Sequence, residues 1–362
     1  MMATNPPIQI AILGAGTFVK SQYLPRLSEI SNLFHLKAIW SRTEKSACSA
    51  VEIANNQFGE VECKWGDNGL HDIIQDPSII AVIVVLAAQH QVDISLKMLK
   101  AGKHVLQEKP AASCIDELET ALSTYKSISA DAPGQIIWSV AENYRFEPAL
   151  VEAKKLIADI GKMMSVQVIV EGSMNSSNPY FSSSWRRSFT GGFILDMGVH
   201  FIAGLRMLVG CEVVSVSAMT SHVNLILPPP DNLSSVFHLE NGCSGVFVMV
   251  VSSRSPKILW RVVGMNGTLQ IERGFQGQHG YLVSLYDANG QCKSSFFPFS
   301  GVTEELKAFF NDVSENTVKK DSQFVPERRL SFVEGARDVA LLEAMLESGS
   351  RQGEQVLVKK LG

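Results

Sequence analysis

A carboxylate and an imidazole lie four residues apart near the middle of the chain, in the segment GGFILDMGVH. Asp196 and His200 have i, i+4 spacing, which puts both side chains on the same face of a helix. The surrounding segment is apolar nearly all round, so an ionised carboxylate there is costly unless another group pairs with it. A histidine beside a carboxylate is a good acid–base unit near neutral pH. The sequence therefore predicts an acid–base pair, with an exposed surface ion pair as the alternative.

A lysine follows a short apolar run in the segment GKHVLQEKP. Glu108 and Lys109 come directly after a predicted strand at 104–107, and the carboxyl ends of parallel strands present ligand-binding groups. An ammonium there could polarise a carbonyl or hold a sugar hydroxyl. We expect Lys109 to be functional in this position, whereas EKP alone is a common surface tripeptide. His104 lies inside the strand and is expected to be packed or at an edge.

A glycine motif follows the first apolar run of the chain, residues 8–13. Gly14 permits a tight strand-to-helix turn, and Gly16 lets a pyrophosphate approach the backbone at a helix N-terminus. The third glycine position of the dinucleotide fingerprint is Val19, which implies looser or shifted helix packing. The motif predicts a phosphate-binding turn, with an ordinary βα turn as the alternative. Its expected cofactor contacts are Gly14, Gly16, Thr17 and Phe18.

The end of the second predicted strand, 34–40, lacks the acidic residue that NAD-selective proteins use to bind ribose hydroxyls. Ser41 and Arg42 stand there instead. A hydroxyl and a guanidinium suit a 2′-phosphate, because arginine offers charge and forked donors. We therefore expect NADP to be preferred over NAD, the alternative being a solvated arginine at a strand end.

The elements that position these residues fall into two halves. In the first half, apolar strands alternate with helices, which predicts a parallel sheet covered on both faces; the strands are expected at 8–13, 34–40, 79–86, 104–107 and 136–144, and helices near 43–57 and 90–101. The second half has longer alternating segments punctuated by Asn241-Gly242, Asn266-Gly267 and Asn289-Gly290, as hairpins are. Helices at 302–320 and 327–349 are expected to close the chain.

These patterns predict an α/β protein of two domains. An N-terminal Rossmann domain with a parallel sheet is expected over residues 1–146. A C-terminal α/β domain with a large, mainly antiparallel open sheet is expected over residues 147–362, and it could serve catalysis and oligomerisation.

Composition excludes several classes of protein. The 362 residues are 46% hydrophobic and 19% charged with a formal charge of −4, so neither a nucleic-acid nor a polybasic membrane partner is indicated. The apolar start enters the glycine motif instead of a cleavage site, and the most apolar segment carries Asp196, His200 and Arg206. The 6 cysteines form no CxxC pair, which argues against a metal site and suits reduced thiols. We expect a soluble cytoplasmic protein without a metal.

The chain resembles the glucose-fructose oxidoreductase, inositol dehydrogenase and rhizopine catabolism (Gfo/Idh/MocA) family over almost its whole length. The resemblance is carried by the GxG start, AGKHVLQEKP, ENYRF, SWRR before GGFILDMGVH, and VVGMNGTLQI. It implies that Lys109 is the family's lysine in EKP and that Asp196 and His200 are its D…H pair in the catalytic helix. It also implies substrate-side roles for Asn143, Tyr144, Arg145, Trp185 and Arg186.

The chain departs from the family after the third strand of the sheet core. The family usually has Thr-Pro and a downstream histidine there, whereas this chain has Leu86-Ala87-Ala88-Gln89-His90-Gln91, with His90 one residue out of register. His90 is therefore read as a plain loop residue. Leu86 and Glu108 remain expected cofactor contacts.

The resemblance implies reversible hydride transfer between NADP(H) and a hydroxyl or carbonyl of a sugar, polyol or related small alcohol. Lys109 would polarise the reacting oxygen, His200 would exchange its proton, and Asp196 would orient His200, the three converging where the nicotinamide faces the second domain. Two alternatives stay open: a non-catalytic dinucleotide-binding sensor of the same fold, and a dihydrodiol- or biliverdin-type reductase. A homodimer or higher homo-oligomer is expected from face-to-face pairing of the large sheet.

Overall fold

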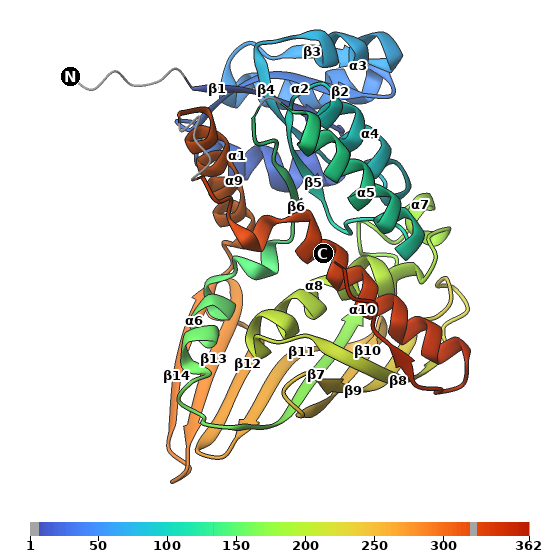
Figure 1. Ribbon diagram of the computed structural model, residues 1–362, viewed down its shortest axis with the longest axis vertical. Coiled ribbons are helices and arrows are strands. Elements are labelled where there is room, and N and C mark those ends of the chain that lie inside the picture. The colour runs from blue at the N-terminus through green and yellow to red at the C-terminus, as the bar shows by residue number, and fades with distance from the viewer. Residues whose placement is uncertain (1–6, 133, 319–323, 362) are drawn as a thin grey trace, which may run out of the picture. The chain divides into compact units, whose positions relative to one another are not determined.

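The computed structural model describes residues 7–132, 134–318 and 324–361, which pack as two units (Figure 1). Unit 1 takes Met1–Ala141 together with Val302–Gly335, and unit 2 takes Glu142–Gly301 together with Ala336–Gly362. The chain therefore leaves unit 1, builds most of unit 2 and returns to unit 1 before it ends in unit 2. The contiguous division at 146/147 expected from the sequence does not include this return.

Unit 1 contains a parallel sheet of six strands in its described residues, in the order β3-β2-β1-β4-β5-β6. The strands are β1 (Ile8–Leu13), β2 (Phe34–Ser41), β3 (Glu62–Trp65), β4 (Ile79–Val84), β5 (His104–Glu108) and β6 (Trp138–Ala141). The helices are η1 (Val19–Tyr23), α1 (Leu24–Ser28), α2 (Glu44–Phe58), α3 (Gly66–Gln75), α4 (Ala88–Lys100) and α5 (Ile115–Asp131). The strand order reverses between β1 and β4, and ligands bind outside the carboxyl ends of strands at such a point. The predicted parallel α/β sheet is confirmed.

The returning segment contributes α9 (Gly301–Val318) to unit 1. Phe310 is fully buried, and its ring stacks on Phe34 of β2 with centroids 4.7 Å apart. Thr303 Oγ1 also donates to Glu29 Oε2 at 2.9 Å. These contacts explain why α9 belongs to unit 1. Of the predicted helix at 302–320, residues 319 and 320 lie outside the described residues.

Unit 2 contains a sheet of nine strands in its described residues, in the order β14-β13-β12-β11-β7-β10-β9-β8-β15. All neighbours are antiparallel except β7 and β10. The strands are β7 (Met163–Ser173), β8 (Val213–Ser221), β9 (Asn232–Leu239), β10 (Ser244–Val250), β11 (Ser252–Gly264), β12 (Gly267–Phe275), β13 (His279–Asp287), β14 (Cys292–Pro298) and β15 (Val356–Leu357). The three Asn-Gly pairs connect consecutive antiparallel strands, and the expected mainly antiparallel sheet is confirmed.

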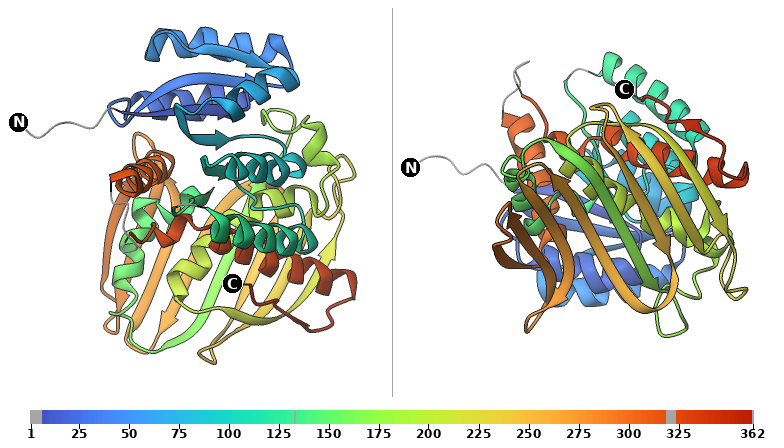
Figure 2. Two further views of the ribbon diagram at one scale, coloured as in Figure 1. Left: turned by 45° about the horizontal axis from the view of Figure 1, so that its top comes forward. Right: turned by 90° about the horizontal axis from the view of Figure 1, so that it is seen from below.

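The helical segments of unit 2 are η2 (Asn143–Arg145), α6 (Pro148–Leu156), α7 (Ser184–Arg187), α8 (Gly192–Val209) and most of α10 (Phe332–Ser350). The right-hand view of Figure 2 shows the strands of this unit as one curved layer with helices behind it. Instead of one helix over 327–349, the structure has η3 (Arg328–Leu330) and then α10. The predicted strand at 136–144 is also shorter, because η2 begins once the carboxylate of Glu142 accepts a hydrogen bond from the Tyr144 backbone N–H.

Helix α8 lies in the core of unit 2. A Cβ at Gly204 would lie 3.2 Å from the indole of Trp260 on β11, so glycine permits a close approach of helix and sheet. Among the described residues, α8 is the one helix long and apolar enough to cross a membrane, but 78% of it is buried inside the fold. A core helix of a soluble protein passes the same test, so this apolar character is weak evidence for a membrane span.

The buried His104 on β5 generates a prediction about acid stability. Burial lowers the pKa of His104 to about 4 from the ordinary 6.5, and its Nδ1 accepts the Ile137 backbone N–H at 3.1 Å, which protonation would forbid. The unfolded state then binds more protons between pH 6.5 and 4, so stability falls as pH falls through this window, by about 3 kcal/mol in total.

The variant His104→Gln removes the titrating group and keeps an acceptor for Ile137. Its free energy of unfolding should depend less on pH than that of the wild type between pH 6.5 and 4. Urea titrations at several pH values measure this difference. Parallel pH dependences for the two proteins would contradict the prediction.

Candidate active site

The turn after β1 is shaped by Gly14 at the point where the strand order reverses. Gly14 has φ +133°, and a Cβ on it would lie 2.1 Å from the Val85 carbonyl oxygen after β4. Its N–H donates to the Trp40 carbonyl at 2.8 Å. A side chain at residue 14 would therefore push β1 and β4 apart, and glycine is required for packing as much as for the turn.

Gly16 has the opposite surroundings. No heavy atom lies within 4 Å of a Cβ built on it, and Gly16 and Thr17 are exposed, with Phe18 half-buried. The backbone at Gly16 therefore faces open space on the side where a Cβ would point. The helix that follows widens into the π-helical turn η1 from Val19, the residue that replaces the third glycine and is fully buried. The helix is thus locally widened at the residue where the dinucleotide fingerprint would have its third glycine.

The carboxylate of Glu108 is held inside unit 1. Tyr23 Oη donates to Glu108 Oε1 at 2.6 Å, and the Lys109 backbone N–H donates to Oε2 at 3.1 Å. Burial, and next the Glu108 charge, raise the pKa of Tyr23 well above its usual value, so the phenol stays a donor. Glu108 thereby fixes the start of the segment that carries Lys109, whose side chain is half-buried.

The remaining expected cofactor residues lie at the carboxyl ends of two other strands. Ser41 ends β2 and is half-buried, and Arg42 is exposed just before α2. Leu86 follows β4 and is half-buried. His90 is exposed, as a loop residue would be, but it lies in the first turn of α4, so its assignment to a loop was wrong. The structure thus places Gly16, Arg42 and Leu86 after three strands of the same parallel sheet, β1, β2 and β4.

Asp196 on α8 pairs with an arginine from the preceding helix. Arg186 Nε donates to Asp196 Oδ2 at 2.8 Å, and Asp196 is only 4% exposed. The Arg186 guanidinium also lies over the rings of Trp185 and Tyr180, at 4.2 and 4.6 Å from their centroids. A stacked, half-buried guanidinium therefore balances the buried carboxylate.

His200, one turn further along α8, pairs with a carboxylate from another element. Its Nδ1 lies 2.7 Å from Glu142 Oε1, and Glu142 is 1% exposed. Tyr144 stacks on the imidazole with centroids 4.7 Å apart, and its own backbone N–H donates to the same Glu142 oxygen at 3.2 Å. Burial raises the pKa of Tyr144 to about 12, so it packs as a neutral phenol. Glu142 and Tyr144 thus fix the imidazole from two sides.

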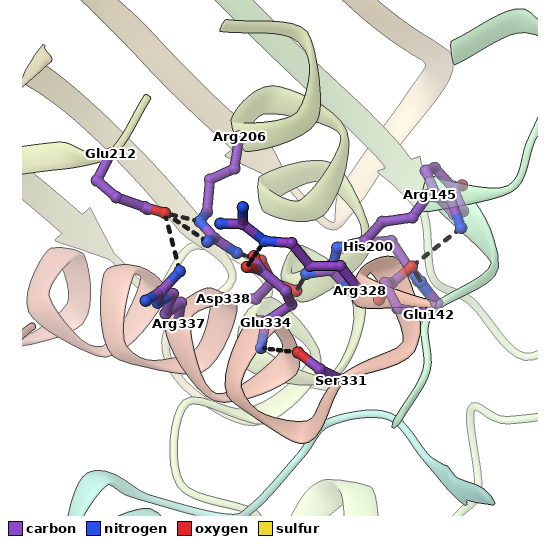
Figure 3. Close-up of polar contacts among 11 residues, drawn as sticks. Glu142, Arg145, His200, Arg206, Glu212, Arg328, Ser331, Glu334, Arg337 and Asp338 are labelled. Atoms are coloured by element: carbon purple, nitrogen blue, oxygen red, sulfur yellow. Dashed lines mark hydrogen bonds and ion pairs between the residues drawn. The ribbon is translucent and has the colours of Figure 1, made fainter. Parts of the chain in front are cut away.

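Arg206, near the end of α8, joins a network of buried charges. It donates to Asp338 Oδ1 at 2.7 Å and to both oxygens of Glu212, at 2.7 and 2.8 Å, as Figure 3 shows. Arg145 donates to the other oxygen of Asp338. Burial raises the pKa of Asp338 and the two guanidiniums oppose that rise. Arg145, expected at the substrate side, is therefore 4% exposed and engaged in this network.

The structure groups the sequence-predicted residues of unit 2 in an unexpected way. Trp185, Arg186 and Asp196 form one cluster, and Tyr144 and His200 form another, while Asn143 donates to Glu147 Oε1 at 3.3 Å. Sequence reasoning missed Glu142. It directly follows β6, so the rule that selected Lys109 after β5 also applies to it.

No group of three or more His, Cys, Asp or Glu side chains that could hold a metal ion occurs within the described ranges.

Two family models match the chain. Residues 8–130 match "Oxidoreductase family, NAD-binding Rossmann fold", and residues 150–270 match "GFO/IDH/MocA C-terminal domain". The chain is 32% identical over 374 residues to "Dehydrogenase FPY6" of Fusarium mangiferae, covering 97% of this chain and 99% of that protein. It is 27% identical over 220 residues to the NADP⁺-dependent scyllo-inositol 2-dehydrogenase IolW of Bacillus subtilis, covering 60% of this chain and 56% of that protein.

Solved structures share the fold. Levoglucosan dehydrogenase in complex with NADH superimposes with a TM-score of 0.77 at 22% identity, covering 98% of this chain and 100% of that one. At this identity the likeness extends to the arrangement of helices and strands only.

The buried network generates a prediction about stability. Asp338→Ala removes the carboxylate shared by the guanidiniums of Arg145 and Arg206, so it should cost about 3–5 kcal/mol of unfolding free energy. Glu347→Ala on the same helix removes only an exposed pair with Arg351 and should cost about 0–1 kcal/mol. Denaturant titration measures both losses. Equal losses of unfolding free energy in the two variants would show that the buried network stabilises the fold no more than an exposed ion pair does.

Proposed function

The chain belongs to the Gfo/Idh/MocA oxidoreductase family and is an NAD(P)-dependent dehydrogenase, and we propose that it transfers a hydride between NADP(H) and a hydroxyl or carbonyl of a sugar, polyol or related small alcohol. The observation that carries the reaction is the pairing of His200 Nδ1 with the buried carboxylate of Glu142 at 2.7 Å. This pairing leaves Nε2 as the nitrogen for proton exchange. The substrate class is supported by curated relatives named for scyllo-inositol and levoglucosan.

The residues of unit 1 fit a dinucleotide. Gly14 keeps β1 and β4 together at the switch point, and the space above Gly16 can take a pyrophosphate. When bound, the nicotinamide supplies or accepts the hydride. We place its diphosphate at Gly16–Phe18, and Leu86 and Glu108 stay expected cofactor contacts elsewhere on the nucleotide. The buried Tyr23–Glu108 bond holds the segment that leads to Lys109.

Arg42 supports NADP as the preferred cofactor. It is exposed directly after β2, where its guanidinium is available to a 2′-phosphate and Ser41 can supply a hydroxyl. Both NAD⁺-dependent and NADP⁺-dependent enzymes occur among the relatives of this chain. The proposed preference for NADP therefore rests on Ser41 and Arg42 of this chain and not on the family.

In the proposed mechanism, two side chains act on the substrate oxygen and its proton, and a third acts through one of them. Lys109 holds and polarises the oxygen as a cation, and His200 takes the hydroxyl proton during oxidation or returns it during reduction. Glu142 fixes the tautomer of His200 and stabilises its protonated form, as a carboxylate does for a catalytic imidazole. Asp196, which Arg186 engages, contributes a negative charge one turn before His200 on α8. Its expected role in orienting His200 stays a prediction.

We further propose a cytoplasmic homodimer or higher homo-oligomer. The strands of unit 2 expose large apolar side chains, and a second copy could cover them; they include Met164 on β7, Met219 on β8, Val236 on β9 and Leu357 on β15. A monomeric mass by light scattering would contradict this assembly.

The cofactor prediction is tested at Arg42. NADP should bind the wild type more tightly than NAD, and Arg42→Ala should narrow that difference by about 1–3 kcal/mol, the range for a lost charged hydrogen bond. Lys126→Ala, which removes an exposed charge from α5, is the control and should leave the difference unchanged. Fluorescence titration gives both dissociation constants. Equal affinity of the wild type for the two nucleotides would exclude the preference.

The catalytic prediction is tested at Lys109 and His200. With NADP and a panel of sugars and polyols, Lys109→Ala and His200→Ala should each lower kcat by about 10²–10⁴-fold while cofactor affinity changes little. The double variant should lose less than the product of the two, because groups acting on one oxygen are non-additive. Lys100→Ala at the end of α4 is the matched lysine control.

Two results would reject this mechanism. A fully active His200→Ala protein would remove His200 from the reaction. Tight NADP binding without turnover of any alcohol or carbonyl in the panel would favour the sensor alternative.

The role of Glu142 is tested against that of Asp196. Glu142→Gln keeps the size of the side chain but removes its charge, so kcat should fall about 10²-fold, and the acidic limb of the pH–rate profile should move to lower pH. Asp196→Asn should move that limb less, because Arg186 already engages Asp196. Melting temperatures measured on the same samples separate loss of fold from loss of activity. A larger shift in Asp196→Asn would give the orienting role to Asp196 instead.

A further inference from the structure

Two cysteine thiols that the proposed mechanism does not use lie against each other in unit 1. Cys48 Sγ and Cys63 Sγ are 3.0 Å apart. Cys48 belongs to α2 and is exposed, and Cys63 belongs to β3, the edge strand of the sheet, and is half-buried. Two elements are thus brought to sulfur–sulfur contact at a surface that small oxidants can reach.

We propose that Cys48 and Cys63 form a redox modification site, in which a hydroperoxide converts the two thiols into an intramolecular disulfide that thiols reverse. The proposal of the modification rests on the contact alone. Its expected effect on the cofactor rests in addition on the proposed function of Arg42.

The geometry favours the bond. A disulfide has an S–S length of about 2.05 Å, so the two sulfurs need to approach by only about 1 Å from their 3.0 Å contact. Cys63 lies opposite Ile39 of β2, and this parallel pairing holds β3 in place while Cys48 on the helix adjusts. In a compartment kept reducing by glutathione, a pair of this kind is transient and redox-sensing rather than structural.

The surroundings of the two sulfurs indicate which cysteine the hydroperoxide oxidises first. Burial, followed by the hydrogen bond and charge of Cys48, raises the pKa of Cys63 to about 11, so Cys63 holds its proton. The exposed Cys48 is therefore the first to react.

The reaction balances with one hydroperoxide. The Cys48 thiolate attacks one oxygen of hydrogen peroxide, the O–O bond breaks, and Cys48 sulfenic acid and hydroxide form. Cys63 sulfur then attacks Cys48 sulfur, the S–S bond forms, the S–O bond breaks, and the departing hydroxide leaves as water with the Cys63 proton. Two thiols lose two electrons in total, and one hydrogen peroxide is reduced to two water molecules.

The bond would link two elements that flank the proposed 2′-phosphate loop, α2 on its carboxyl side and β3, which pairs with the end of β2. Ser41 ends β2, Arg42 and Thr43 follow, and α2 begins at Glu44, one turn before Cys48. A disulfide from Cys48 to Cys63 therefore joins the beginning of α2 to the strand beside β2. Oxidation should draw the start of α2 toward β3, displace Arg42 and lower the preference for NADP over NAD.

The first experiment maps the modification on the full chain. Wild-type protein is treated with hydrogen peroxide, its remaining thiols are alkylated, and non-reducing peptide maps are recorded. We expect a Cys48–Cys63 linked peptide that dithiothreitol removes. Cys48→Ser and Cys63→Ser should lose this peptide, and Cys292→Ser, which removes an exposed cysteine from β14, should retain it. A wild-type map with sulfinic acid at Cys48, or with mixed pairs in place of this one, would overturn the proposal.

The second experiment measures the consequence for the cofactor. Dissociation constants of NADPH and NADH are determined for reduced and oxidised protein, and the NADPH:NADH selectivity of the wild type should fall at least about threefold on oxidation. Cys48→Ser should show no change. Unchanged selectivity with the linked peptide present would overturn the coupling to Arg42, while absence of NADP preference in the reduced protein would instead contradict the proposed function.

Discussion

The pairing of charges on α8 is the constraint on which unit 2 depends. This helix lies in an apolar core and still carries Asp196, His200 and Arg206, each of which would be costly there as an ion without a partner. Each is met by a group from a different element: Arg186 from α7, Glu142 after β6, and Asp338 from α10. Each pair therefore ties α8 to one of its neighbouring elements, and a change that removes one partner leaves a buried charge unbalanced.

The contacts that stabilise the η2 turn also include those made by the proposed catalytic histidine. The buried Glu142 carboxylate accepts the Tyr144 N–H at the start of η2, and the same oxygen contacts His200 Nδ1. Arg145, three residues after Glu142, ties the other end of that turn to Asp338. A substitution in this turn acts on both stability and proton transfer, so activity and melting have to be measured together before any of these residues is assigned one role.

Local features of the structure could be predicted from the sequence, whereas the pairing of residues far apart in the chain could not. Apolar runs and Asn-Gly pairs predicted both sheets, because period and turn chemistry are local properties. The spacing of Asp196 and His200 put both on one helix face, but it could not reveal that their strongest visible partners are Arg186 and Glu142, which come from 10 and 58 residues away. The apolar residues of α9 likewise did not reveal which sheet the helix covers. In the structure, Phe310 of α9 stacks on Phe34 of the parallel sheet.

The return of residues 302–335 to unit 1 sets an order of events during synthesis. A ribosome releases Met1–Ala141 long before α9 exists, so Phe34 waits without Phe310 while most of unit 2 is translated. Unit 2 also waits, because Asp338 comes from its last segment. Both units thus complete their cores only after residue 301 has been translated, and until then each lacks part of its apolar packing. A gene fragment that ends after the parallel sheet encodes an incomplete core rather than a portable nucleotide-binding module.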